Sequence, residues 1–251
     1  MRSCGFRRHW PWPNIAHAGK VRAYGVMPKR LIPALLSFNG GFVDTAGFLG
    51  LQGLFTAHVT GNFVTLGAAL VFGTHGVIAK LLALPEFVLV IAAARVIGAA
   101  LRRHGQDALR PLLAAKVICL LAFFVLAVAL GPFPDSDAPA ALLTGFAGIA
   151  GMAIQNAVQR VHFAAIPPTT LMTGNTTQAA LDAVDLLHPQ PGMDVAAIRA
   201  RLGRLLRGIA WFAIGCGIAA VLYYFAGFWC LAVPVAVGAA TAILRDPAPT
   251  V

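Results

Sequence analysis

The sequence predicts an all-α polytopic membrane protein with about six spanning helices, two broken or re-entrant segments and an inverted internal repeat. Three observations lead to this fold class. Of the 251 residues, 59% are hydrophobic and only 11% are charged, whereas ordinary soluble domains carry roughly 25% charged residues. Several apolar runs approach or exceed the roughly 20 residues that a helix needs to cross a bilayer. A Thr-Gly-Asn triplet also occurs twice inside apolar sequence, at 60–62 and 173–175.

Six apolar runs are expected to form the spanning helices. In chain order they are 31–51, 84–101, 112–131, 140–161, 205–225 and 228–244. The segments around the triplets, roughly 53–73 and 167–187, are apolar but richer in polar residues. Irregular backbone at membrane depth is tolerated only where protein or a watery cavity satisfies its polar groups. These two segments are therefore expected either to cross fully or to re-enter and return.

The placement of basic residues distinguishes these two topologies. Of the 19 Lys and Arg residues, 16 lie before residue 31, within 102–116, within 199–207 or at Arg245. Cytoplasmic loops accumulate such residues, and membrane topology explains the net charge of +10 without nucleic acid binding. Eight full crossings would put the 102–116 cluster on the wrong side. If both triplet segments return, all four clusters lie inside, and Lys80 is the one loop base left outside.

This topology implies two halves inverted relative to one another, each with three helices and one re-entrant segment. The halves are expected at 31–131 and 138–245, and the acidic loop 132–137 between them should face outside. A basic cytoplasmic leader, 1–30, and a short cytoplasmic tail, 246–251, would flank them. Met27 is an alternative start, because the helical pattern begins abruptly after it.

The triplets are expected to begin half-helices at 63–72 and 176–187. Glycine permits backbone conformations that other residues avoid, and Thr and Asn side chains cap helix starts. Half-helices starting near the midplane would point their positive ends at a polar or anionic solute. The candidate site residues here are Thr60, Gly61, Asn62, Thr173, Gly174 and Asn175. Alternatively, the triplets lie in ordinary crossing helices, where glycine permits close packing and Thr and Asn form interhelical hydrogen bonds.

Two further polar residues lie inside the expected helices. Asp44 falls about 20 Å along the first helix, at 1.5 Å per residue, where a carboxylate usually faces a cavity or a partner. It is a candidate proton-coupling or ligand group, or else it bonds a nearby backbone amide. Asn156 occupies the corresponding place in the second half. Arg95 is expected either to extend toward the interface or to pair with Asp44.

The residues "GGFVDTAGFLGLQGLFTAHVTGNFVTLG" and "GMAIQNAVQRVHFAAIPPTTLMTGNTTQ" resemble the YoaK-like bacterial transmembrane family of unknown function. The resemblance covers roughly 31–245. It implies a multi-pass protein of the bacterial inner membrane, and members are sometimes labelled possible small-molecule permeases. It carries over no substrate and no mechanism.

The functional prediction is a secondary transporter or channel for a small polar or anionic solute, with proton coupling considered at Asp44. The alternatives are an intramembrane enzyme acting on a lipid, with Asp44 and His58 as acid and base, and a membrane scaffold without transport. No Walker glycine loop, zinc motif or serine hydrolase motif supports an enzyme. The sequence predicts no metal or other cofactor. The expected partners are membrane lipid and the solute, and a homo-oligomer is left open.

Overall fold

The computed structural model describes residues 31–243, and within them all regular secondary structure is helical. The elements are α1 (Leu31–Gly50), α2 (Gly61–Phe72), α3 (Val77–Arg103), α4 (Leu109–Leu130), α5 (Pro139–His162), α6 (Met172–Leu187), α7 (Val195–Ala226), the 3₁₀-helix η2 (Gly227–Leu231) and α8 (Ala232–Ile243). The expected leader, the alternative start at Met27 and the C-terminal tail lie outside the described residues.

Long apolar helices confirm the prediction of an all-helical membrane protein. Four stretches are long and apolar enough to span a bilayer: Val77–Arg103, Leu109–Leu130, Pro139–His162 and Val195–Ile243, the last of which joins α7 to α8. Each of the six runs expected to be helical coincides with α1, α3, α4, α5, α7 or the pair η2 and α8. How many of them cross a bilayer stays a prediction.

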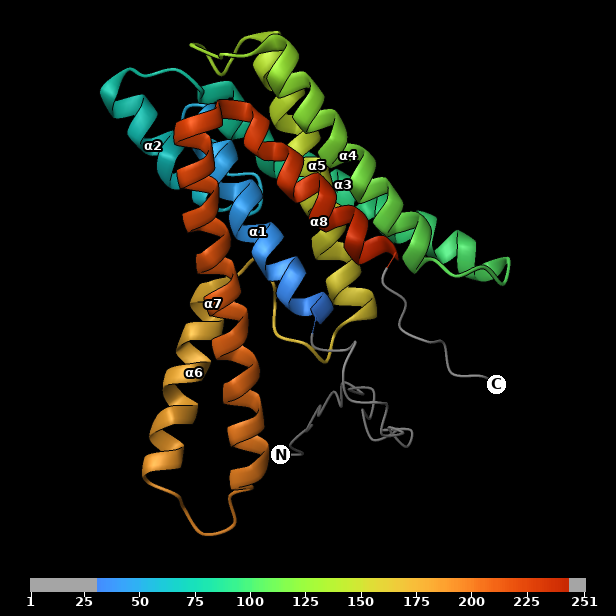
Figure 1. Cartoon of the computed structure of the whole chain (residues 1–251), viewed down its shortest axis with the longest axis vertical. Coiled ribbons are helices and arrows are strands. Elements are labelled where there is room, and N and C mark those ends of the chain that lie inside the picture. The colour runs from blue at the N-terminus through green and yellow to red at the C-terminus, as the bar shows by residue number, and fades with distance from the viewer. Residues whose placement is uncertain (1–30, 244–251) are drawn as a thin grey trace, which may run out of the picture.

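Helix α1 is the inner helix of the bundle. Of its 20 residues 13 are buried, and it packs chiefly against α7 (Figure 1). Two glycines permit this close crossing, because a β-carbon at Gly41 would collide with the carbonyl oxygen of Phe212, and one at Gly215 with that of Phe38. Small residues serve this purpose at helix contacts in membranes. Since protein surrounds α1, this helix can carry polar residues.

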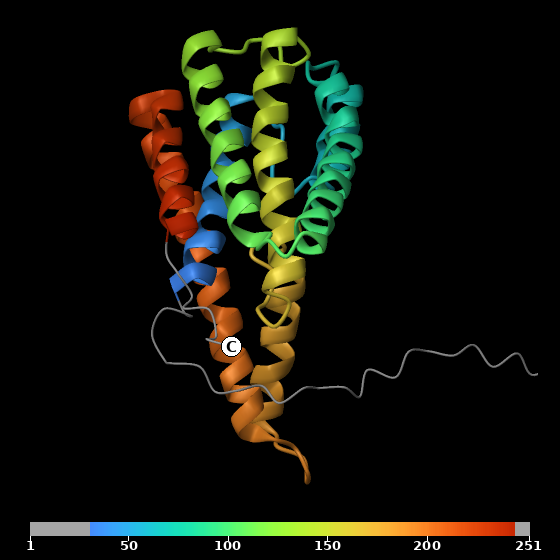
Figure 2. The same ribbon diagram turned by 90° about the vertical axis from the view of Figure 1, so that its right-hand side faces the viewer.

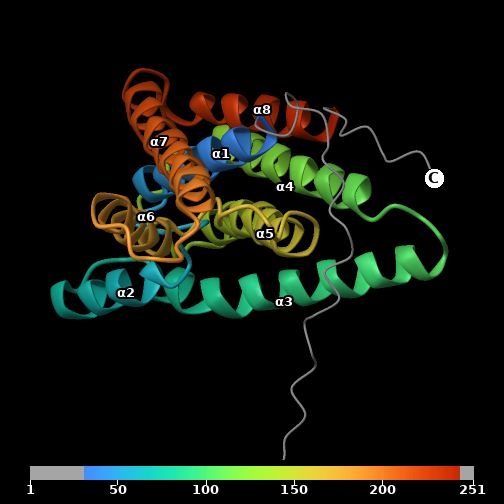
Figure 3. The same ribbon diagram turned by 90° about the horizontal axis from the view of Figure 1, so that it is seen from below.

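The other helices pack on α1, on α5 or on each other. Helix α7 packs on α1 and α3 packs on α5, while α6 packs on α7 and α2 packs on α3. Helix α4 packs on α5 and α8 packs on α1, and α4 and α8 also pack on each other. Seen from below, α5 lies between α3 and the group formed by α1, α4 and α8 (Figure 3). In Figures 1 and 2, α1 ascends and α5 descends.

The two triplet segments begin with irregular backbone, and a helix follows. After α1 ends, residues 51–60 turn back along the bundle before α2 rises again (Figure 2). After α5 ends, residues 163–171 connect to α6, which runs beside the lower half of α7 (Figure 1). The expected half-helices therefore exist, although α2 begins two residues and α6 four residues earlier than the sequence indicated.

The loops divide between the two ends of the molecule. The α3–α4 connection, the end of α5 and the beginning of α7 lie toward the end at which α1 begins (Figures 1 and 2). The acidic loop 132–137 lies at the opposite end. The basic clusters within 102–116 and 199–207 thus share one end, although Lys116, expected in a loop, is fully buried in α4.

Lys80 corrects a second expectation, because it is not a loop residue. It lies in the first turn of α3 and is only 3% exposed. Its Nζ donates to the carbonyl oxygens of Gln52 at 3.0 Å and His75 at 3.3 Å. Beside it, Asp137 accepts from the amides of Gly76 and Ala79. Lys80 thus ties the end of α1 to the beginning of α3, which accounts for a base at the acidic end.

Candidate functional site

The two triplet asparagines make equivalent contacts. Asn62 Oδ1 accepts from the Phe55 amide and Asn62 Nδ2 donates to the Phe55 carbonyl oxygen, both at 2.8 Å. Asn175 Nδ2 donates to the carbonyl oxygen of Pro168, also at 2.8 Å. Each asparagine thus reaches seven residues back and closes the irregular segment that precedes its helix. Proline has no amide hydrogen, so the second asparagine cannot form the other bond.

The triplets do not cap their helices as the sequence indicated. Thr60 is the N-cap of α2 but makes no side-chain capping hydrogen bond. The N-cap of α6 is Leu171, and Thr173 and Gly174 lie inside the first turn. The asparagine side chains bind backbone upstream of the helix instead. The physical reason is that the irregular segments contain buried peptide groups that need partners.

Asp44 holds the first irregular segment from α1. Its Oδ1 accepts from the amides of Thr56 at 2.8 Å, Ala57 at 2.7 Å and His58 at 3.2 Å, and the residue is only 5% exposed. The pairing with Arg95 considered from the sequence is absent, because within residues 31–243 no salt bridge joins them. A buried carboxylate that binds successive amides stabilises that loop conformation.

Polar residues of α5 hold the second irregular segment in the same manner. Gln155 Nε2 donates to Thr169 Oγ1 at 3.3 Å, and Thr170 Oγ1 donates to Asn156 Oδ1 at 2.7 Å. One turn further, Gln159 Nε2 donates to the carbonyl oxygen of Ile166 at 3.0 Å. Gln155, Asn156 and Gln159 of α5 therefore face the second irregular segment, as Asp44 of α1 faces the first.

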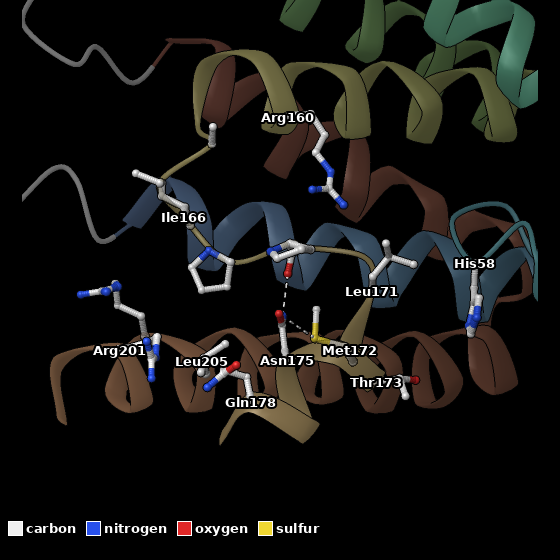
Figure 4. A pocket seen from close by; sticks show the side chains of 16 residues that line it. His58, Arg160, Ile166, Leu171, Met172, Thr173, Asn175, Gln178, Arg201 and Leu205 are labelled. Carbon is white, nitrogen blue, oxygen red and sulfur yellow. Dashed lines mark hydrogen bonds between the residues drawn. The ribbon is translucent and has the colours of Figure 1, made fainter. Parts of the chain in front are cut away.

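A cavity of about 670 Å³ lies beside the second segment, within the size range of small-molecule sites. Its walls come from the end of α5, residues 164–171, the first turns of α6 and the basic part of α7. The first irregular segment contributes His58 at one end (Figure 4). Arg160 points toward the cavity from α5, above Asn175 and Met172 (Figure 4).

A second cavity of about 340 Å³ lies on the other side of Arg160 and Leu171, which line both. It contains Thr60 of the first triplet and Asn156 of α5, and Arg95 enters it from α3. The two irregular segments therefore meet in the middle of the molecule. The first segment contributes to the cavity beside α6, and the second contributes to the cavity beside α3.

The eight sequence-predicted site residues are only partly brought together. Thr173, Gly174 and Asn175 line the larger cavity, and Thr60 and Asn156 line the smaller one. The remaining three, Asp44, Gly61 and Asn62, line neither. Asp44 and Asn62 are buried and occupied with backbone groups. They therefore position the segments that form the cavity walls.

The larger cavity carries an excess of positive charge. Arg160, Arg201 and Arg204 line it together with His58. Arg201 is paired, because Asp182 of α6 accepts from its Nε at 2.8 Å and its Nη2 at 2.6 Å. Within residues 31–243 no carboxylate forms a salt bridge with Arg160 or Arg204.

Asp182 of α6 pairs with the basic cluster of 199–207 through Arg201. The Asp182 side chain has no exposed surface, and Gln178 Nε2 also donates to it at 2.7 Å. The hydrogen bonds from the Arg201 guanidinium hold the pKa of the Asp182 carboxyl below its usual range. This carboxylate is therefore charged at neutral pH and joins α6 to α7.

One comparison with known protein families found a match over most of the chain. A family described as "Protein of unknown function (DUF1275)" matches residues 32–244. The chain belongs to the DUF1275 family. This membership confirms the resemblance to a YoaK-like family of unknown function. No curated protein and no solved structure matches this DUF1275 chain.

Sequence reasoning about this DUF1275 protein missed three basic residues of the larger cavity, Arg160, Arg201 and Arg204. Arg160 follows Asn156 by one helical turn, so the two share a face of α5, and this spacing is the signal that could have found it. Arg204 was counted only as part of a cytoplasmic cluster. Its approach to the second irregular segment depends on how α6 and α7 pack, which spacing along the chain does not reveal.

Proposed function

We propose that the protein is a secondary transporter or channel for a small anionic solute, with the larger cavity as its binding site. The observation that carries this proposal is the pair of guanidiniums, Arg160 and Arg204, which line a cavity of small-molecule size and form no salt bridge within residues 31–243. Guanidinium groups bind carboxylates and oxyanions with directed, charge-assisted hydrogen bonds. The first turn of α6, which includes Thr173 and Gly174, adds the positive end of a helix dipole.

An inverted repeat supports a transport role, because many transporters bind substrate where two inverted halves meet. Each half packs helices on the first helix of the other half. Helix α7 packs on α1 as α3 packs on α5, and α8 packs on α1 as α4 packs on α5. The seven-residue reach of Asn62 and of Asn175 is a second correspondence. Asp44 and Asn156 each hold an irregular segment about 14 residues further on.

The topology proposed with this function has six spans and two re-entrant segments. Basic loops accumulate on the cytoplasmic side of a membrane. In this proposal the beginning of α1 and the 199–207 cluster therefore face the cytoplasm, and the membrane is the bacterial inner membrane. Both termini then lie in the cytoplasm, and the acidic loop 132–137 faces outside. The larger cavity lies near the basic end and is therefore expected to admit solute from the cytoplasm.

The contacts of Asp44 favour a carrier over the enzyme considered from the sequence. An acid–base pair needs the Asp44 carboxylate and the His58 imidazole to act on a shared substrate. Asp44 instead binds the backbone amide of His58, together with two neighbouring amides. This geometry gives Asp44 a structural task in forming the cavity wall.

Uptake into proteoliposomes tests the proposal. The purified full chain is reconstituted, and uptake of chloride, nitrate, acetate, succinate and phosphate is measured. At least one of these anions should enter faster than in empty vesicles, and Arg160→Gln and Arg204→Gln should each reduce its uptake at least tenfold. Arg103→Gln is the matched control, because Arg103 is exposed at the end of α3 and lines neither cavity. Uptake of none of the five, or equal loss in the control, would contradict the proposal.

A further inference from the structure

A lysine, Lys116, is buried inside the helix bundle, and the function proposed above gives it no role. Lys116 of α4 has no exposed surface. With the Asn39 amide oriented to suit its neighbours, Asn39 Oδ1 accepts from Lys116 Nζ at 3.1 Å and Asn39 Nδ2 donates to the Pro234 carbonyl oxygen at 3.2 Å. Within residues 31–243 no carboxylate forms a salt bridge with Lys116.

The ionisable groups on the surrounding elements do not supply a counter-charge. They are Asp44 on α1; Lys80, Glu86, Arg95, Arg102 and Arg103 on α3; Arg110 and Cys119 on α4; Arg160 and His162 on α5; and Cys230 on η2. Helix α8 contains none. The carboxylate of Asp44 is committed to three backbone amides. Lys116 is therefore buried with one neutral partner.

A buried ammonium is costly without a counter-charge, because the surrounding protein and lipid replace its hydration poorly. A neutral amine needs less compensation, and one hydrogen bond to Asn39 suits it. A group of this kind binds a proton when negative charge arrives nearby and releases it when that charge leaves. Intramembrane ionisable residues commonly serve proton relays in transporters.

Helix α1 links Lys116 to the wall of the larger cavity. Asn39 contacts Lys116 on one side, and the next residue, Gly40, touches the second irregular segment. A β-carbon at Gly40 would lie 2.8 Å from the carbonyl oxygen of Thr169 and 3.2 Å from Cγ2 of Thr170. This segment continues directly into Leu171, which lines both cavities. Adjacent residues of α1 therefore contact both Lys116 and the segment that forms the wall of the larger cavity.

We propose that Lys116 binds the proton that accompanies the anion through the membrane, an inference that rests on the function proposed above. When an anion occupies the larger cavity, a proton from water adds to the lone pair of Lys116 Nζ. The ammonium then retains its bond to Asn39 and partly offsets the anion's charge. The proton leaves to water on the other side when the anion does, so that one proton moves with each anion and no covalent bond to the anion forms.

The test measures proton and anion movement in the same vesicles. Proteoliposomes containing a trapped pH dye receive an inward gradient of each of the five anions. Wild-type protein should acidify the lumen together with anion uptake. Lys116→Met has similar volume and no titratable group, so it should acidify the lumen at least tenfold more slowly. Its melting temperature in the same detergent checks that the variant is folded.

A second variant keeps the test decisive if Lys116→Met does not fold. Asn39→Asp places a carboxylate beside Lys116, which should hold the proton permanently and also abolish acidification. Acidification at the wild-type rate in either variant would overturn the role of Lys116. Anion uptake without acidification in the wild type would overturn the coupling but leave the carrier intact. Uptake of no anion by the wild type would overturn the carrier, and the coupling with it.

Discussion

At the residue scale, the polar side chains of the candidate site act largely on backbone groups. Asp44 binds three amides, and Asn62 and Asn175 each close an irregular segment. Each asparagine contacts the backbone seven residues earlier, and the two contacts differ. Phe55 offers both an amide and a carbonyl, whereas Pro168 offers only a carbonyl.

This difference predicts unequal costs for one substitution made in both halves. Asn62→Ala removes two hydrogen bonds to backbone groups. Asn175→Ala removes one bond to backbone and a long, weak one of 3.7 Å to the sulfur of Met172, and each buried bond to backbone contributes on the order of 1 kcal/mol. The expected loss of unfolding free energy is therefore about 2 kcal/mol for Asn62→Ala and about 1 kcal/mol for Asn175→Ala. Thermal melting of the two variants in the same detergent measures the order. A larger loss for Asn175→Ala would contradict these contacts.

At the scale of elements, the crossing of α1 with α7 fixes the centre of the molecule. Substitutions at two glycines of α7, Gly215 and Gly217, distinguish the effect of packing from that of helix propensity. A β-carbon at Gly215 would collide with the carbonyl oxygen of Phe38, whereas one at Gly217 would meet nothing within 4 Å. Helix propensity alone favours Ala over Gly at both positions by about 1 kcal/mol.

Gly215→Ala should therefore lower the melting temperature and reduce anion uptake, since α1 must move away from α7. Gly217→Ala should leave both unchanged or raise the melting temperature slightly. Melting and proteoliposome uptake of the pair provide the measurement. Equal behaviour of the two variants would show that α1 and α7 do not cross as closely as described.

The sequence predicted the positions of the helices better than it predicted which polar side chains are buried between them. The glycines of the triplets predicted that α2 and α6 begin nearby, to within two and four residues, because glycine permits a local break in the backbone. Lys80 was placed in a loop, and Lys116 was counted with the basic cluster of a loop because cytoplasmic loops accumulate such residues. Their burial depends on Gln52 and Asn39, which are distant in sequence and come close only in the folded bundle.

At the scale of the whole molecule, the account depends on two halves inverted in the bilayer. The proposed orientation rests on where the basic residues lie along the chain, and the proposed symmetry rests on the corresponding packing of α3 with α5 and of α7 with α1. Such an arrangement brings Thr60 and Thr173 to the cavities from opposite ends of the molecule. Both side chains belong to exposed residues, so a cysteine at either position should be accessible to a labelling reagent.

Side-specific cysteine labelling tests this central claim most directly. Cys4, Cys119, Cys216 and Cys230 are first replaced by serine, and Thr60→Cys or Thr173→Cys is introduced singly. A membrane-impermeant maleimide is then applied to intact cells or to inside-out vesicles. Labelling of Thr60→Cys only from the periplasmic side and of Thr173→Cys only from the cytoplasmic side is the predicted result. Labelling of both cysteines from the same side would contradict the inverted arrangement and the pathway built on it.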